Sequence, residues 1–390
     1  MRHRVLAAFA IAIVAAASCA RTPRTTGVVL GPPFVAPQVW GALEPDGYAV
    51  RLDTLMRRAP AKEGWAAAGR PVQITIWSPA TARGTPLTYR DYVGLTANQA
   101  SLDPATADAS AAAVAALRRF VVSTGSSIES VEEWMNMPVA ASWNAPKATS
   151  RFPLVVIAQG NYHSAYNQAV IGEYLASHGY VVATSPSPLV LEQTPDDASL
   201  LTRARRQAAD IEYIVDVMRA RADVDSTRIA VVAHSFGARA AFVAAADGTP
   251  FRAFVSLDGG IANKLGNDWL TGTPLDTAQL RIPLLHIYQD RDSTVQPDFT
   301  LVRRWHGSDR NLVRVDAMYH PYFTALGFVT AVDTALHVGP PVADLGVKVG
   351  GVVQMTGAFL DAVLRRHATT PALPRANTKP FSTEHLSIGQ

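Results

Sequence analysis

The feature that most constrains this chain is a repeated alternation, from residue 152 onward, of short apolar runs with amphipathic segments. Strands that are apolar along their whole length are buried on both faces, which is typical of a parallel sheet covered by helices. The sequence therefore predicts an α/β fold with a mostly parallel central sheet and helices on both faces. The expected strands are residues 152–159, 180–185, 228–235, 252–258, 283–290 and 312–318, and the expected helices are residues 167–179, 196–222, 237–248 and 351–368.

The rest of the chain does not follow this alternation. A strand is predicted at residues 72–77, between prolines, and the Ala-rich stretch 89–147 is predicted to be a helical insertion. Residues 21–70 are rich in Pro, Gly and Arg, so we expect an extended segment over the surface that adds little to the core. Residues 369–390 are expected to be a loose tail. The predicted α/β domain spans residues 71–368.

Composition excludes several classes of function. Of the 390 residues, 48% are hydrophobic and 17% charged, and the formal net charge is +3, which is typical of a globular chain with no nucleic-acid partner. The one cysteine, Cys19, lies near the N-terminus. A disulfide framework, a thiolate metal site and a cysteine nucleophile are therefore excluded from the predicted domain. Neither a metal nor an organic cofactor is expected.

Residues 1–20 have the layout of a secretory signal peptide: a short basic start, an apolar run and small residues. Two processing outcomes are open. The segment 16–19 resembles a bacterial lipoprotein box, in which Cys19 is lipidated and anchors the protein to a membrane. Alternatively, an ordinary signal peptidase cuts after Ala20 and removes the cysteine. Both outcomes predict a secreted or periplasmic protein, and they differ in whether a lipid anchors it to the bacterial envelope.

The strand expected at residues 228–235 runs directly into Ser235, and a helix of small residues follows. This is the context in which a G-x-S-x-G segment forms a nucleophile elbow, a strained turn that exposes a serine hydroxyl. The first glycine is replaced here by Ala233, whereas Gly237 is kept. Both residues are small, as the crowded turn requires. The alternative interpretation is a serine that only caps a helix.

A serine hydroxyl is a weak nucleophile, so a histidine must take its proton and a carboxylate must hold the imidazole. His320 is the histidine that lies just beyond the last expected core strand, where the base is found in folds with such an elbow. Asp258 and Asp292 follow two successive expected strands. Both have the correct chain order for the acid, and spacing alone leaves both open.

The negative charge that develops on the substrate oxygen needs hydrogen-bond donors. The backbone N–H of Phe236, directly after the nucleophile, supplies one. The loop after the strand 152–159 is predicted to supply the other through the N–H of Asn161, where Gly160 lets the backbone turn.

Four other histidines receive different predictions. His234 is expected to pack under the elbow, and His286 lies within an expected strand. His163 is a loop residue for which a contact with substrate is one interpretation. His306 is expected on the surface.

Five segments resemble the plasma-type platelet-activating-factor acetylhydrolases and their bacterial relatives, within the α/β-hydrolase superfamily. The resemblance covers residues 71–329, with Gln159 where that family usually has His and the segment 185–188 where it has a charged motif. The segments are FPLVVIAQG, LASHGYVVA, DSTRIAVVAHSFG, FRAFVSLDGG and MYHPYFT.

The resemblance implies Ser235 as nucleophile, His320 as base and Asp258, rather than Asp292, as acid. It also implies Asn161 and Phe236 as oxyanion donors. The function it implies is hydrolysis of carboxylic esters, small or lipid-like, through an acyl-enzyme. Two alternatives stay open: a noncatalytic binding lipoprotein with this fold, and an amide or peptide hydrolase with the same triad.

Overall fold

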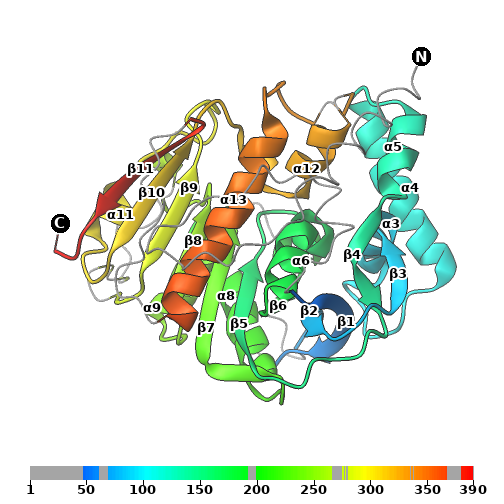
Figure 1. The fold of residues 1–390 in the computed structure, drawn as a ribbon, viewed down its shortest axis with the longest axis horizontal. Helices are drawn as coiled ribbons and strands as arrows, with labels where there is room; N and C mark the ends of the chain where they lie inside the picture. Colours follow the sequence, from blue (N-terminus) through cyan, green and yellow to red (C-terminus); the bar gives the residue numbers. More distant parts are fainter. Residues whose placement is uncertain are drawn as a thin grey trace, which may run out of the picture.

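The computed structural model describes residues 47–60, 69–191, 199–265, 275, 277, 280–333, 335–336, 338–366 and 379–389. Within these residues eleven strands form one sheet, in the order β11-β10-β9-β8-β7-β5-β6-β2-β1-β4-β3 (Figure 1). The strands are β1 (Ala49–Arg58), β2 (Pro71–Ala80), β3 (Thr85–Thr88), β4 (Pro138–Trp143), β5 (Phe152–Ala158), β6 (Val181–Thr184), β7 (Val224–His234), β8 (Ala253–Leu257), β9 (Leu284–Tyr288), β10 (Arg310–Val315) and β11 (Phe381–Leu386).

Helices connect most neighbouring strands. The α-helices are α3 (Tyr89–Gly94), α4 (Ala107–Ser123), α5 (Ile128–Met135), α6 (Ala169–Ser177), α7 (Pro188–Leu191), α8 (Leu200–Arg219), α9 (Gly237–Ala246), α11 (Thr300–Arg304), α12 (Ala325–Val332) and α13 (Leu345–Leu360). Short 3₁₀ segments are η2 (Leu95–Asn98), η3 (Ala165–Gln168) and η5 (His320–Phe323), and α13 continues into the π-helical turn η6 (Asp361–Arg365).

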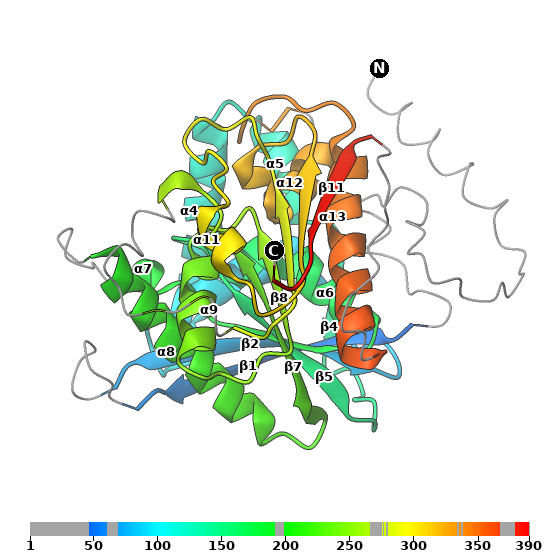
Figure 2. The same cartoon turned by 90° about the vertical axis from the view of Figure 1, so that its left-hand side faces the viewer.

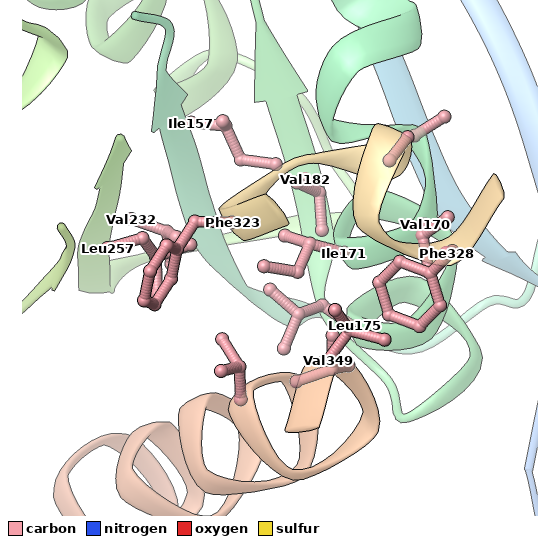
Figure 3. Close-up of a cluster of buried hydrophobic side chains, with 14 of the residues drawn as sticks. Ile157, Val170, Ile171, Leu175, Val182, Val232, Leu257, Phe323, Phe328 and Val349 are labelled. Carbon is pink, nitrogen blue, oxygen red and sulfur yellow. The ribbon is translucent and has the colours of Figure 1, made fainter. Parts of the chain in front are cut away.

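The predicted parallel sheet with helices on both faces is confirmed. From β6 through β5 to β10 all neighbouring strands run parallel. In β5, Leu154, Val156 and Ala158 belong to one core cluster, whereas Val155 and Ile157 belong to the other. The first cluster is covered by α8 and α9, and the second by α6, α12 and α13. Figure 3 shows part of the second core, to which Ile157 and Val182 of the sheet and Phe328 and Val349 of the helices all belong.

The N-terminal part of the sheet differs from the prediction. Residues 49–58 were expected to be extended surface chain, yet they form β1, which pairs with β2 over ten residues in an antiparallel register. Val50 and Leu52 are fully buried. The expectation of little core was wrong here because this antiparallel pairing places one face of β1 against the helices. The sheet is strongly twisted, so that β1 and β2 run across the view in Figure 2 while β8 runs upward.

The predicted insertion at residues 89–147 is helical only in part. It contains α3, α4 and α5, and it then returns to the sheet as β4, which pairs with β1 and β3. Thr106 caps α4 and Ser127 caps α5, each by accepting a hydrogen bond from a backbone N–H three residues on.

The chain beyond α13 also departs from the prediction. The tail was expected to be loose, but Phe381–Leu386 forms β11, which pairs with β10 over six residues at the edge of the sheet. The sheet therefore extends beyond both ends of the predicted domain 71–368. Within the described part of the chain, the helix Leu345–Arg365 is long and apolar enough to cross a membrane. However, 72% of its most apolar stretch is buried inside the fold. It is a core helix here.

Candidate active site

Ser235 lies at a sharp turn between β7 and α9, with a φ of 53°. This left-handed conformation is strained for a serine and is what a nucleophile elbow imposes. The turn is held by hydrogen bonds from Ser235 N to Leu257 O (3.2 Å) and from Gly260 N to Ser235 O (2.7 Å). Gly237 has no room for a side chain, because a Cβ there would lie 2.2 Å from Ala158 O.

His320 is the first residue of η5, beyond the end of β10. Its Nε2 lies 2.9 Å from Ser235 Oγ, and its Nδ1 lies 2.6 Å from Asp258 Oδ2. The imidazole therefore connects the hydroxyl to a carboxylate, in the order that general-base activation of serine needs. The His320 side chain is 20% exposed, whereas that of Asp258 is only 4% exposed, so the base is partly open to solvent and the acid is buried.

Asp258 directly follows β8 and has a φ of 44°. Besides His320, its carboxylate accepts hydrogen bonds from the backbone N–H and the side-chain Nε2 of Gln289, each at 3.3 Å. Burial raises the pKa of Asp258 above its ordinary value, and the hydrogen bonds from His320 and Gln289 oppose that rise. Asp292 accepts from Thr294 N (2.9 Å) in an exposed turn. The structure thus brings Asp258, and not Asp292, to His320.

The loop after β5 lies against the nucleophile. A Cβ at Gly160 would lie 3.1 Å from Ser235 Cβ, so the backbone of this loop passes within contact distance of the elbow. Asn161 and Phe236 line one small recess beside Ser187 and Gln207. The two predicted oxyanion donors are therefore neighbours. Tyr162 follows with a φ of 60° and a side chain that is 69% exposed.

The remaining histidines take different places. His286 is buried in β9, where its Nδ1 contacts Ser256 Oγ at 2.9 Å, and burial lowers its pKa to about 3. His234 is buried at the end of β7, as expected, with its ring beside that of His320. The ring of His163 stacks on that of His234. His306 lies in the chain between α11 and β10.

Sequence reasoning missed two supporting residues. Gln289 holds Asp258 and also accepts hydrogen bonds from the backbone N–H groups of Arg291 and Asp292. Arg239, buried on α9, donates from Nε to Gly260 O at 3.0 Å, just after Asp258, and burial lowers its pKa to about 10. A polar residue directly after a buried strand was the available signal for Gln289. An arginine within an Ala-rich apolar helix was the signal for Arg239.

Part of the chain matches a known family. Residues 101–263 match a family described as PETase, PET hydrolase-like. This match includes Asn161, Ser235 and Asp258, whereas His320 lies beyond it.

Within the described residues, no group of three or more His, Cys, Asp or Glu side chains is placed to hold a metal ion.

Curated relatives match over a similar length. The chain is 31% identical over 165 residues to Cutinase 2 of Thermobifida cellulosilytica, which is 42% of this chain and 56% of that protein. It is 31% identical over 165 residues to Cutinase cut1 of Thermobifida fusca, again 42% of this chain and 46% of that protein. The chain thus matches about half the length of these relatives.

The fold itself matches over nearly the whole chain. A ferulic acid esterase from Streptomyces cinnamoneus superposes with a TM-score of 0.63, covering 89% of this chain and 99% of that one, at 19% sequence identity. Together with the parallel sheet and its two helical layers, this likeness confirms the predicted α/β-hydrolase fold. The narrower resemblance to platelet-activating-factor acetylhydrolases stays a prediction.

Proposed function

We propose that this protein is a serine hydrolase of carboxylic esters that works through an acyl-enzyme. The observation that carries the proposal is the contact of the His320 imidazole with two partners, Ser235 Oγ at 2.9 Å from Nε2 and Asp258 Oδ2 at 2.6 Å from Nδ1. The partial matches to cutinases and to a PET hydrolase-like family support the same reaction class.

In the first half of the reaction, Ser235 Oγ attacks the ester carbonyl while His320 Nε2 takes the hydroxyl proton. The negative charge on the carbonyl oxygen is held by the backbone N–H groups of Phe236 and Asn161. His320 then gives its proton to the departing alcohol, which leaves the acyl group on Ser235. Asp258 accepts the Nδ1–H bond throughout and stabilises the imidazolium.

In the second half, a water molecule takes the place of the alcohol. His320 accepts a proton from the water as its oxygen attacks the acyl carbonyl, and the same donors hold the second oxyanion. The bond to Ser235 Oγ breaks, and His320 returns the proton to that oxygen. The carboxylic acid leaves, and the site is restored.

The substrate class follows from the openness of the site. The His320 side chain is partly exposed and Tyr162 beside the oxyanion loop is 69% exposed. We therefore propose substrates whose bulk stays outside the protein, such as the polyester chains suggested by the names of the relatives. Phospholipid specificity, the narrower implication of the family resemblance, is not part of this proposal.

Hydrolysis of a series of p-nitrophenyl esters of increasing acyl length tests the reaction, with Ser235→Ala as the control. We expect turnover by the native protein and a loss on the order of 10⁴-fold or more in the variant, because the nucleophile is gone and little buried volume changes. A fluorophosphonate should label the native protein at Ser235. A variant with only tenfold lower turnover contradicts the assignment of the nucleophile.

Release of soluble products from a polyester film tests the substrate class. We expect native protein to release them and Ser235→Ala not to. If the protein hydrolyses the p-nitrophenyl esters but releases no products from the film, ester hydrolysis is supported and the polyester substrate is contradicted.

The leader suggests a secreted or periplasmic protein, with Cys19 as a lipid anchor. This part of the chain lies outside the described residues, and the proposal rests on the order of basic, apolar and small residues at positions 1–20. The intact mass of protein from the membrane fraction should show a diacylglyceryl group on Cys19. A soluble mature protein that begins at Arg21 would support plain secretion.

A further inference from the structure

Two histidines outside the proposed triad form successive ring contacts with its imidazole. The ring of His234 faces that of His320 at a centroid distance of 4.9 Å and an interplanar angle of 25°. The ring of His163 stacks on that of His234 in turn, at 5.2 Å and 6°. The three rings come from the loop after β5, the last residue of β7 and the first residue of η5. We call these three rings the histidine stack.

Hydrogen bonds alone do not fix the plane of His320. Its two bonds leave from opposite nitrogens, toward Asp258 Oδ2 and Ser235 Oγ. They fix the line that joins the partners, but the ring can still rock about that line. A flat ring packed against one face of the imidazole removes this freedom, and parallel offset stacking is a favourable geometry for aromatic rings.

The two added rings are uncharged at neutral pH. Burial lowers the pKa of His234 well below its ordinary value, and repulsion from the protonated forms of His320 and His163 lowers it further. Burial, with a smaller effect of His320, lowers the pKa of His163 to about 4. This neutrality is needed, because a cation stacked on His320 would repel the imidazolium that forms when Ser235 gives up its proton.

The stack also contacts the loop that carries Asn161. A Cβ at Gly160 would lie 2.8 Å from His234 Nδ1 and 3.0 Å from His163 Nδ1. Only a residue without a side chain lets this loop close against the stack. The same group of rings therefore touches both sides of the proposed reaction centre, the base and the oxyanion loop.

We propose that His234 and His163 are positioning residues that hold the His320 imidazole in the plane of Ser235 and Asp258 through their flat, uncharged faces. The inference rests on the proposed ester hydrolysis and adds two residues to its machinery. They act through His320 and do not touch the substrate.

Substitution of His234 by residues of different shape tests the proposal. His234→Leu fills the site with an apolar side chain that lacks the flat face, so we expect kcat for a p-nitrophenyl ester to fall on the order of 10- to 100-fold with KM changed less than about twofold. His234→Phe keeps the flat face and should restore kcat to within about threefold of the native value. The rate of fluorophosphonate labelling should follow kcat in both variants.

His178→Leu is the matched control, because His178 also stacks on an aromatic ring, that of Tyr174 at 4.1 Å, but lies at the end of α6 away from Ser235. Its kcat should not change. If either change at position 234 prevents folding, the pair His163→Leu and His163→Phe makes the same comparison at the outer ring, with a smaller expected difference.

Two outcomes overturn the proposal. If the Leu and Phe variants both keep a kcat near the native value, the flat face does not matter, and if the Phe variant is as slow as a slow Leu variant, the histidine nitrogens matter instead. Both leave activity dependent on Ser235. Failure of the proposed function looks different, because ester turnover would then survive in Ser235→Ala.

Discussion

The two ends of the sheet are built on different principles. From β5 to β10 the strands are parallel, and their carboxyl ends meet at one edge, where Ser235, Asp258 and His320 come together. From β1 to β4 antiparallel pairs predominate, and the insertion helices pack on them. The proposed triad thus lies at the parallel end, where helices connect the strands. We call the part formed by β1 to β4 the hairpin end, and we expect it to support the fold. Changes at the first end should lower turnover, and changes at the second should lower stability.

The hairpin end contains its own buried polar network. Trp77 Nε1 of β2 donates to Tyr92 Oη of α3 at 2.6 Å, and Tyr92 donates in turn to Glu173 Oε1 of α6 at 2.6 Å. Glu173 also accepts from the backbone N–H groups of Ala140 and Ala141 in β4. One network of hydrogen-bonded side chains therefore joins the sheet, the insertion and α6. Nothing in it contacts the proposed triad.

The largest expected effect is at the parallel end. Asp258→Asn should lower kcat on the order of 10⁴-fold, because an amide in place of the carboxylate favours the wrong tautomer of His320. The melting temperature should change little, since shape and volume are kept. Asp292→Asn is the matched control, and its kcat should stay near that of the native protein. Turnover of one p-nitrophenyl ester decides between them, and a crippled Asp292→Asn would assign the acid to the turn after β9.

The parallel end of the sheet could be predicted from the sequence better than the hairpin end. Continuous apolar runs such as residues 228–235 indicate buried parallel strands, so the strand ends that carry Ser235 and Asp258 could be predicted. β1 could not, because its sequence, AVRLDTLMRR, mixes polar and apolar residues and its burial depends on pairing with β2. β11 was missed for the same reason, as its pairing with β10 is a nonlocal contact.

The site shows the same limit. Strand-end position identified two candidate acids and one histidine, but it could not choose between Asp258 and Asp292. In the structure the two aspartates have different contacts with Gln289, which follows the next strand. Gln289 donates a hydrogen bond to the carboxylate of Asp258, whereas it accepts one from the backbone N–H of Asp292. The histidine stack joins residues far apart in the sequence, and no local pattern predicts such a contact.

Buried tryptophans at the two ends sharpen the comparison. Trp77 is fully buried at the hairpin end, so Trp77→Ala should lower the free energy of unfolding by about 3–5 kcal/mol. Its kcat per folded molecule should stay within about twofold of the native value. Trp305, equally buried, packs edge-on against Phe242 of α9 and Phe254 of β8, the helix that follows Ser235 and the strand that precedes Asp258. Trp305→Ala should therefore lower both stability and kcat.

Urea unfolding and ester turnover, measured on the same preparations, test this pair. A loss of kcat in Trp77→Ala as large as that in Trp305→Ala would show that the two ends are coupled. The division between a catalytic end and a supporting end would then be wrong.

The smallest expected effect is in the dependence of stability on pH, where the two ends should have opposite signs. Burial raises the pKa of Glu173 to about 7, so between its ordinary pKa of 4.5 and pH 7 the folded state keeps a proton that the unfolded chain releases. Its contribution to stability is present below pH 4.5 and is lost as the pH rises toward 7. His286, at the catalytic end, has a pKa lowered from 6.5 to about 3. Its contribution is present above pH 6.5 and is lost as the pH falls toward 3.

Glu173→Gln and His286→Gln remove one titration each. Relative to the native protein, the first variant should lose less stability between pH 5 and pH 7.5, by about 2 kcal/mol, because the buried carboxyl no longer has to ionise in the core. The second should lose less stability between pH 6.5 and pH 4.5, by a similar amount, because the unfolded chain no longer gains a proton that the fold excludes. Urea midpoints across this pH range measure both effects. If stability depends on pH with the same slope in a variant and in the native protein, the substituted residue does not contribute to that dependence. Because a constant change in stability caused by either substitution cancels in the slope, the comparison isolates the proton. It therefore tests whether the hairpin end favours a protonated carboxyl while the catalytic end favours neutral imidazoles.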